Sequence, residues 1–290
     1  MSVKLSSLIA RTAVPHSAPV YVGGGGGGIR QTVLSGPVDS NGHADFLEVG
    51  TGLQVVSKNL DTSPLQVTFG QGFENSIPSD KVSTINNNLT WDNLEDNTVN
   101  FLYLEMNGSG GVTTGSGILP PEYAYIKPAS PSSGQFFYPT THLEKGSVWN
   151  GSSWVPTLRL YVGECVTSSG VVTDVVSYAY NGRMYVKDVT MPRSSSAVIN
   201  HNIGTELIEV ENYLVFINDL DGYSVGNRIH TTTSPLGSAG LRINYAVLDR
   251  KAFCISNEDT RVRFVRLSGG DSDARDLNNF VYEGFFTRSF

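Results

Sequence analysis

Hydrophobic and polar residues alternate with a period of two along most of the chain after Gln31. The segment Leu65–Phe69 alternates, which predicts a strand with one buried face. Residues 101–106 are almost continuously apolar and predict a central strand that is buried on both faces. Residues 261–267 alternate arginine with apolar residues, so we expect one buried face and one that meets solvent or a partner chain. No segment predicts a long amphipathic helix.

Asn-Gly dipeptides, which favour tight hairpin turns, lie beside several of these predicted strands. They occur at Asn107-Gly108, Asn150-Gly151 and Asn181-Gly182. The pair at Asn150 predicts a type I′ hairpin turn between Trp149 and Trp154, and a longer loop is the alternative because Ser152 also lies between the tryptophans. Further strands are predicted at residues 53–57, 158–162, 171–176, 183–186, 207–211, 213–217 and 241–245.

An uninterrupted glycine run divides a short N-terminal segment from the rest of the chain. Glycine loses more backbone freedom on folding than any other residue, so the run predicts a flexible tether. A phosphate-binding loop is the alternative, but no Gly-Lys-Ser/Thr follows the glycines. The tether consists of Gly23, Gly24, Gly25, Gly26, Gly27 and Gly28.

A second boundary follows from Pro192 and the serine cluster at residues 194–196, after which the strand pattern restarts. We therefore predict an all-β chain with two antiparallel β-sandwich-like domains. The first covers residues 29–190 and the second covers residues 191–290. Both follow an N-terminal peptide and tether at residues 1–28.

Charge and composition narrow the possible partners. The 290 residues include 16% charged residues, below the ~25% of typical globular domains, and the formal net charge is −7. This acidic balance argues against nucleic-acid binding, which needs clustered lysine and arginine. No stretch approaches the ~20 apolar residues of a membrane helix. The first residues lack the apolar core of a secretory signal, so we expect synthesis and folding in a cytoplasm.

Candidate chemistry is sparse. The five histidines are scattered without the spacing of a zinc site, at His16, His43, His142, His201 and His230. We expect His201, in a turn, to make a structural hydrogen bond. Asp219 and Asp221 resemble a fragment of a calcium loop, but the remaining ligands are missing and a polar turn is expected. No Gly-x-Ser-x-Gly nucleophile motif occurs. We predict no enzyme activity, no metal and no cofactor.

Two further features leave alternatives open. Trp149 and Trp154, with aromatic neighbours, could form a platform on which sugars stack, although aromatic residues at this density more often form cross-strand pairs and core. Cys165 and Cys254 could pair, but two reduced thiols buried in strands are favoured, because nothing in the sequence sets their separation.

The order of several segments is more informative than any single motif. A strand at residues 100–104 follows Leu-Thr-Trp-Asp-Asn-Leu at 89–94, and a Ser/Pro/Gly linker at 130–136 precedes the Trp-Asn-Gly-x-x-Trp hairpin at 149–154. Farther on, Asn-His-Asn-Ile-Gly at 200–204 precedes Gly-Tyr-Ser-Val-Gly at 222–226. Together these segments resemble tailed-bacteriophage fibre and appendage proteins. The chain departs from the resemblance at Ile203, where leucine is usual, and at Asn227, where aspartate is usual.

This resemblance implies a structural component of a virion, an oligomeric tail or collar fibre, expected to be a trimer, that is made in the host cytoplasm. Residues 1–28 would attach it to other virion proteins, with apolar anchor candidates at Leu5, Leu8, Ile9, Val20 and Tyr21. The alternative is a receptor-binding protein whose C-terminal domain recognises a host surface glycan, with contact candidates Trp149, Trp154 and Tyr223. A glycan depolymerase is disfavoured because no short repeat of a β-helix is visible.

Overall fold

The computed structural model describes the chain from residue 33 to residue 288, with gaps. The described residues are 33–38, 44–58, 64–69, 81–106, 111–119, 129–137, 145–179, 182–206, 208–230, 243–257, 260–264, 266–267, 269 and 274–288. The predicted anchor residues and the glycine tether lie outside them. The regular elements of the described chain are β-strands and one short 3-10 helix, η3 (Leu277–Asn279), and all strand pairs are antiparallel. The prediction of an all-β fold is confirmed.

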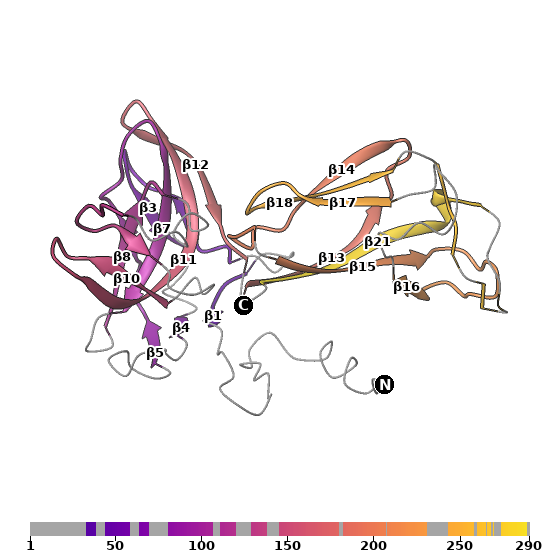
Figure 1. Cartoon of the computed structure of the whole chain (residues 1–290), viewed down its shortest axis with the longest axis horizontal. Helices are drawn as coiled ribbons and strands as arrows, with labels where there is room; N and C mark the ends of the chain where they lie inside the picture. The colour runs from indigo at the N-terminus through magenta and orange to yellow at the C-terminus, as the bar shows by residue number, and fades with distance from the viewer. Residues whose placement is uncertain are drawn as a thin grey trace.

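The N-terminal lobe, β1 to β12, is built around a six-stranded sheet (Figure 1). Its order is β8-β7-β11-β10-β9, and β12 also pairs with β11. The strands are β7 (Val99–Met106), β8 (Val112–Gly117), β9 (Phe136–Phe137), β10 (Lys145–Trp149), β11 (Trp154–Ser168) and β12 (Val171–Ser177). The length of β11 lets it pair with β7 on one edge and with β10 and then β12 on the other.

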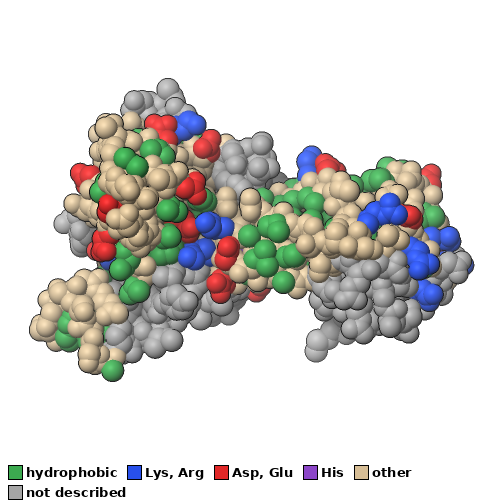
Figure 2. All heavy atoms as spheres, turned by 90° about the horizontal axis from the view of Figure 1, so that it is seen from above, with side chains coloured by type: hydrophobic (Ala, Val, Ile, Leu, Met, Phe, Trp, Pro, Cys, Tyr) green, Lys and Arg blue, Asp and Glu red, His purple; other side chains and the backbone are tan. Residues whose placement is uncertain are grey.

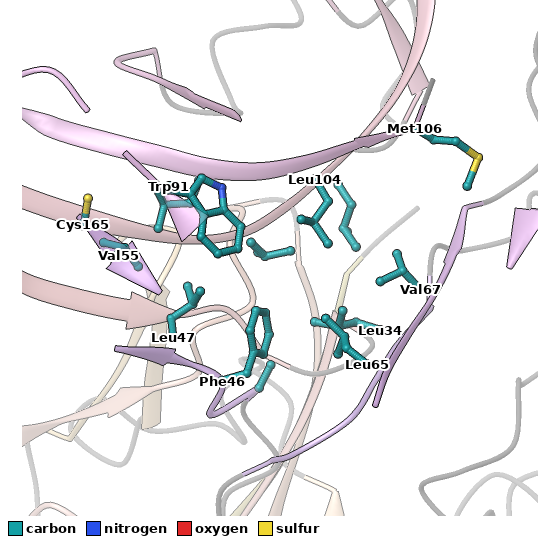
Figure 3. Packing of buried hydrophobic residues seen from close by; sticks show 14 of the residues in the cluster. Leu34, Phe46, Leu47, Val55, Leu65, Val67, Trp91, Leu104, Met106 and Cys165 are labelled. Atoms are coloured by element: carbon teal, nitrogen blue, oxygen red, sulfur yellow. The ribbon is translucent and has the colours of Figure 1, made fainter. Parts of the chain in front are cut away.

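Two small sheets complete this lobe. One consists of β1 (Val33–Ser35), β4 (Leu65–Phe69) and β5 (Lys81–Ile85); the other consists of β2 (Leu47–Val49), β3 (Val55–Ser57) and β6 (Thr90–Trp91). Their apolar residues share a core with β7 and β11, where Trp91 and Phe46 lie among leucines and valines (Figure 3). In β7, Phe101 and Leu102 are both buried, as predicted for a strand covered on both faces, whereas Tyr103 is only half-buried.

The C-terminal lobe, β13 to β21, consists of two facing sheets and a short pair (Figure 1). The larger sheet has the order β13-β21-β15-β16, and the smaller has the order β14-β18-β17. The larger sheet comprises β13 (Arg183–Thr190), β15 (Ile208–Phe216), β16 (Arg228–His230) and β21 (Phe280–Arg288). The smaller comprises β14 (Ser195–Asn200), β17 (Ile243–Val247) and β18 (Ala252–Asn257), and the short pair is β19 (Arg261–Val262) with β20 (Arg275–Asp276). Aromatic residues of both sheets, such as Phe253 and Phe286, form one core between them.

The strand pairing and the cores divide the molecule near residue 178. One core draws its residues from positions 34–172, and another draws its residues from positions 179–286. Strand β13 lies before the predicted boundary at 190/191, yet it pairs with β21 at the far end of the chain. Where independently folding domains begin and end stays a prediction, but β13 belongs to the sheet of the C-terminal lobe.

Candidate functional site

The larger sheet of the C-terminal lobe carries a row of aromatic side chains on the face turned away from its core. Each strand contributes one ring: Tyr185 from β13, Phe285 from β21, Tyr213 from β15 and His230 from β16. The residues that follow or precede them along the strands, Met184, Phe286 and Leu214, are buried in the core. Because successive side chains of a strand point to opposite faces, the four rings share the outer face. We call these four residues the aromatic row.

The rings of the aromatic row contact one another in sequence across the sheet. Tyr185 and Phe285 stack with ring centroids 4.4 Å apart and planes at 18°. Tyr213 is nearly perpendicular to both of its neighbours, at 6.0 Å from Phe285 and 5.4 Å from His230. His230 is exposed, 38% of Tyr185 is exposed, and the other two rings are half-buried. The row therefore presents ring surface to solvent on one face of the sheet.

Charged and polar groups lie directly beside these rings. The buried carboxylate of Glu283 accepts hydrogen bonds from Arg228 Nε at 2.5 Å and from a terminal guanidinium nitrogen at 3.2 Å. This pairing raises the pKa of Arg228 above its ordinary value. Tyr185 interacts with the same ion pair through its hydroxyl, and the hydroxyl of Tyr213 donates to Glu211 Oε2 at 3.3 Å.

Both tyrosines of the row keep their hydroxyl protons at neutral pH. Burial raises the pKa of Tyr185, and the hydrogen bond to Glu283 adds to that effect. Burial also raises the pKa of Tyr213, and the negative charge of Glu211 adds to it. The face thus combines apolar ring surface with phenol, carboxylate and guanidinium groups, each able to donate or accept hydrogen bonds.

The tryptophans predicted from the sequence lie elsewhere, on the β10–β11 hairpin of the N-terminal lobe. Trp149 and Trp154 are cross-strand partners with ring centroids 5.5 Å apart. Asn150 N donates to Ser153 O at 3.1 Å, and the side-chain oxygen of Asn150 accepts from the backbone N–H of Ser152 and Ser153. The hairpin loop therefore spans residues 150–153, which is the longer of the two predicted loops.

Tyr223, the third predicted glycan contact, serves the core of the C-terminal lobe. Its ring stacks on Phe216 with centroids 4.6 Å apart, and its backbone exchanges two hydrogen bonds with Leu220. Tyr223 lies between β15 and β16, in a different lobe from the tryptophans (Figure 1). The structure does not bring these three predicted residues into one site.

Sequence analysis missed the aromatic row because its members come from four strands, and the sequence pattern does not predict which strands pair. Tyr185 and Phe285 are 100 positions apart in number yet are direct partners. The available signal was weak: aromatic residues at outward positions of predicted strands, such as Tyr213 and Tyr185. Only the register of β21 between β13 and β15 places them in line.

Three other residues considered for chemistry have structural partners, whereas His16, His43 and His142 lie outside the described residues. His201 is buried and its Nδ1 accepts from Ile203 N at 3.1 Å, which confirms the predicted structural hydrogen bond. Asp219 accepts from Val225 N, and Asp221 accepts two hydrogen bonds from Arg275 at 2.9 and 2.7 Å. The described residues contain no group of three or more His, Cys, Asp or Glu side chains placed to hold a metal ion.

The two cysteines lie in different lobes and are free thiols. Cys165 is buried in the core of the N-terminal lobe (Figure 3), and Cys254 is half-buried in β18. The disulfide alternative is therefore wrong. Burial raises the pKa of the Cys165 thiol to about 11, and the charge of Glu164 contributes to the shift.

Comparisons with known proteins give no family assignment. No family model, curated protein or solved structure matches this chain. Within the described part of the chain, no helix has the length and apolar character needed to cross a membrane.

Proposed function

We propose that the chain is an appendage protein of a bacteriophage virion and that its C-terminal lobe binds carbohydrate through the aromatic row. The observation that supports carbohydrate binding is the line of four rings crossing a sheet beside hydrogen-bonding side chains. The observation that supports the appendage role is the ordered set of segments between residues 89 and 230 that resembles phage fibres.

Sugars suit this face because they combine apolar C–H surfaces with hydroxyl groups. A ring such as Tyr213 can pack against the C–H face of a sugar, while carboxylates accept and guanidinium groups donate hydrogen bonds at its edge. The Arg228–Glu283 pair holds two of these polar groups in place before a ligand arrives. A prearranged site loses less conformational entropy on binding.

The charge of the face disfavours phosphate-rich ligands. Glu209 and Glu211 are exposed on β15, and Glu283 already engages Arg228. The whole chain carries a formal net charge of −7. Nucleic acids and other polyanions would meet repulsion here, which leaves sugars as the ligand class with the best chemical match.

Binding of the full-length chain to an array of bacterial surface glycans, followed by calorimetry, tests the carbohydrate proposal. We expect Tyr213→Ala to weaken binding by about 10- to 100-fold, the usual effect of removing a central aromatic contact. Trp154→Ala is the matched control, because it removes a half-exposed ring from the other lobe and should leave affinity unchanged. Loss of binding in the tryptophan variant alone would refute binding through the aromatic row and assign it to the β10–β11 hairpin. No binding to any glycan would refute carbohydrate binding and leave a purely structural appendage.

The appendage role is tested separately. Light scattering should give the mass of a stable oligomer, which we propose to be a trimer, whereas a strict monomer would contradict a fibre. Deletion of residues 1–28 should leave a folded, soluble oligomer that no longer joins phage particles. Particles that still incorporate the truncated chain would rule out N-terminal anchoring.

A further inference from the structure

A buried carboxylate joins the two lobes. Glu164 lies on β11 of the N-terminal lobe, and only 5% of its side chain is exposed. Its Oε1 lies 2.6 Å from Lys251 Nζ, and its Oε2 lies 3.1 Å from Arg250 Nε. Both cations belong to the turn between β17 and β18 in the C-terminal lobe. One carboxylate therefore receives two positive charges from the opposite lobe.

A β-bulge explains why Glu164 faces the other lobe. Before the bulge, Leu158, Leu160 and Val162 point into the N-terminal core. The register between β11 and β7 shifts between Tyr161 and Gly163, and after the shift Cys165 points into that core. An extra residue in one strand reverses which positions face inward, so Glu164 points out of the core toward the joint.

The chain segment that links the lobes is attached to the same carboxylate. The hydroxyl of Tyr178 donates to Glu164 Oε2 at 2.8 Å. The backbone of Tyr178 is also held within the N-terminal lobe, because its N–H donates to Val162 O at 2.9 Å and its carbonyl accepts from Ala44 N at 3.3 Å. The link is thereby fixed at both its main chain and its side chain.

The C-terminal side of the joint is equally constrained. His201 N donates to Lys251 O at 2.7 Å and Gly204 N donates to Arg250 O at 2.9 Å, so backbone bonds position the turn that carries the two cations. Gly204 has φ +86° and lies against the ring of Tyr178, where a Cβ atom would come within 2.5 Å of Cδ2. The Arg250 guanidinium lies 4.6 Å above the Phe101 ring of the N-terminal lobe.

We infer that this cluster, which comprises Glu164, Tyr178, Arg250 and Lys251, locks the lobes in one relative orientation and makes the chain a single rigid arm. All of its contacts can form together in only one arrangement of the lobes. The carboxylate of these ion pairs is buried and the two cations are partly buried, so salt screens the pairs less than it screens surface pairs. Side chains of both charges lie where the lobes meet (Figure 2). Removing the Glu164 carboxylate leaves both cations at the joint without their common partner, and removing Lys251 leaves the buried carboxylate with Arg250 as its cationic partner, so both changes weaken the joint. This lock does not depend on carbohydrate binding.

Spin labels on the two lobes can test the lock by measuring the distribution of distances between them. Val171→Cys and Val198→Cys place labels at exposed positions of β12 and β14. They are introduced into the full chain with Cys254→Ser, and Cys165 is retained because it is buried. We expect one narrow distance peak in this parent and its loss in Glu164→Gln.

The control and a second variant make the outcome decisive. Glu105→Gln removes a partner of Arg159 within the N-terminal lobe and should keep the narrow peak, since it lies outside the joint. Lys251→Met removes one cation from the joint, and it replaces Glu164→Gln as the test variant if Glu164→Gln does not fold. A broad distribution in the parent, a narrow peak in both joint variants, or equal broadening by Glu105→Gln would overturn the inference.

Discussion

Each lobe places an arginine–glutamate pair among aromatic rings on the outer face of its main sheet, but the two pairs differ in exposure. In the N-terminal lobe, Arg159 donates to Glu105 Oε2 through Nε at 2.9 Å and a terminal nitrogen at 2.6 Å. Its guanidinium lies 3.7 Å from the centroid of Tyr103, and only 7% of its side chain is exposed. In the C-terminal lobe, 50% of the Arg228 side chain is exposed and its partner Glu283 is buried.

The same groups therefore serve different purposes in the two lobes. Around Arg159 the cation is enclosed, and Gly115 on β8 leaves the space that the Tyr103 ring occupies, because a Cβ atom there would come within 2.4 Å of it. Around Arg228 the cation reaches water and the aromatic row stays accessible. The enclosed Arg159–Glu105 pair can contact only other groups of the protein, so it serves the fold. The more exposed Arg228–Glu283 pair keeps hydrogen-bonding groups available to a ligand.

We expect the largest change in the free energy of unfolding when the enclosed Arg159–Glu105 pair is broken. Glu105→Ala leaves the Arg159 guanidinium buried without its carboxylate, so we expect the free energy of unfolding to fall by about 3 kcal/mol. Urea denaturation measures this change. Adding Arg159→Met to Glu105→Ala should restore part of the loss, because the unpaired charge is then removed. A double variant less stable than Glu105→Ala would contradict this explanation.

The matching change in the C-terminal lobe should cost less. After Glu283→Ala, the half-exposed Arg228 side chain can regain water, so we expect a loss of about 1 kcal/mol in the same urea experiment. Carbohydrate binding should weaken together with this modest destabilisation, because Arg228 and Tyr185 lose their common partner. Equal destabilisation by Glu105→Ala and Glu283→Ala would show that solvent exposure does not determine how much each pair contributes to the free energy of unfolding.

Local patterns in the sequence predicted part of the strands, because such patterns depend only on neighbouring residues. The prediction of two strands at 207–211 and 213–217 was wrong, since they form the single strand β15, and β14, β18 and β21 were not predicted. Leu65, Val67 and Phe69 are buried on alternate positions of β4, as the alternation indicated. The hairpin at Asn150 also follows from local turn chemistry. The segment 261–267 keeps its alternation at Val262 and Phe264, which are buried, but among its described residues only Arg261–Val262 forms a strand. Arg266 instead lies with its Nε 3.8 Å from the Asp221 carboxylate.

Long-range pairing and register could not be predicted from such patterns. Strand β21 ends the described chain, yet it lies between β13 and β15, and this arrangement creates the aromatic row. The bulge in β11 reverses the inward positions by a single residue, and this reversal directs Glu164 to the joint. Both features depend on contacts between residues far apart in the sequence, so sequence reasoning assigned no functional role to Tyr213 or Glu164.

The two cysteines also differ in how accessible they are, and we expect this difference to appear in the reactivity of their thiols. With a pKa of about 11, Cys165 is a thiolate in only ~0.1% of molecules at pH 8, and it is also buried. We expect a maleimide reagent to modify Cys254 alone in the folded protein and both cysteines in urea. Mass spectrometry of tryptic peptides identifies the modified residue. Rapid modification of Cys165 without denaturant would contradict its enclosure.

The Arg275–Asp221 pair of the C-terminal lobe should give the smallest effect. Here we expect a change in how the free energy of unfolding depends on pH. Hydrogen bonds from Arg275 lower the pKa of Asp221 below its ordinary value of 3.8. The unfolded chain therefore binds more protons than the folded chain as the pH falls through this range, and acid removes the stability that Asp221 contributes above it. In Asp221→Asn, the number of protons taken up on unfolding below about pH 5 should decrease by up to about one.

Urea denaturation from pH 3 to 6 measures the slope of the free energy of unfolding against pH, which gives this number of protons. Asp174→Asn, at an exposed position of β12, is the control. An unchanged slope in Asp221→Asn would mean that this pair, unlike the enclosed Arg159–Glu105 pair, contributes little to folding.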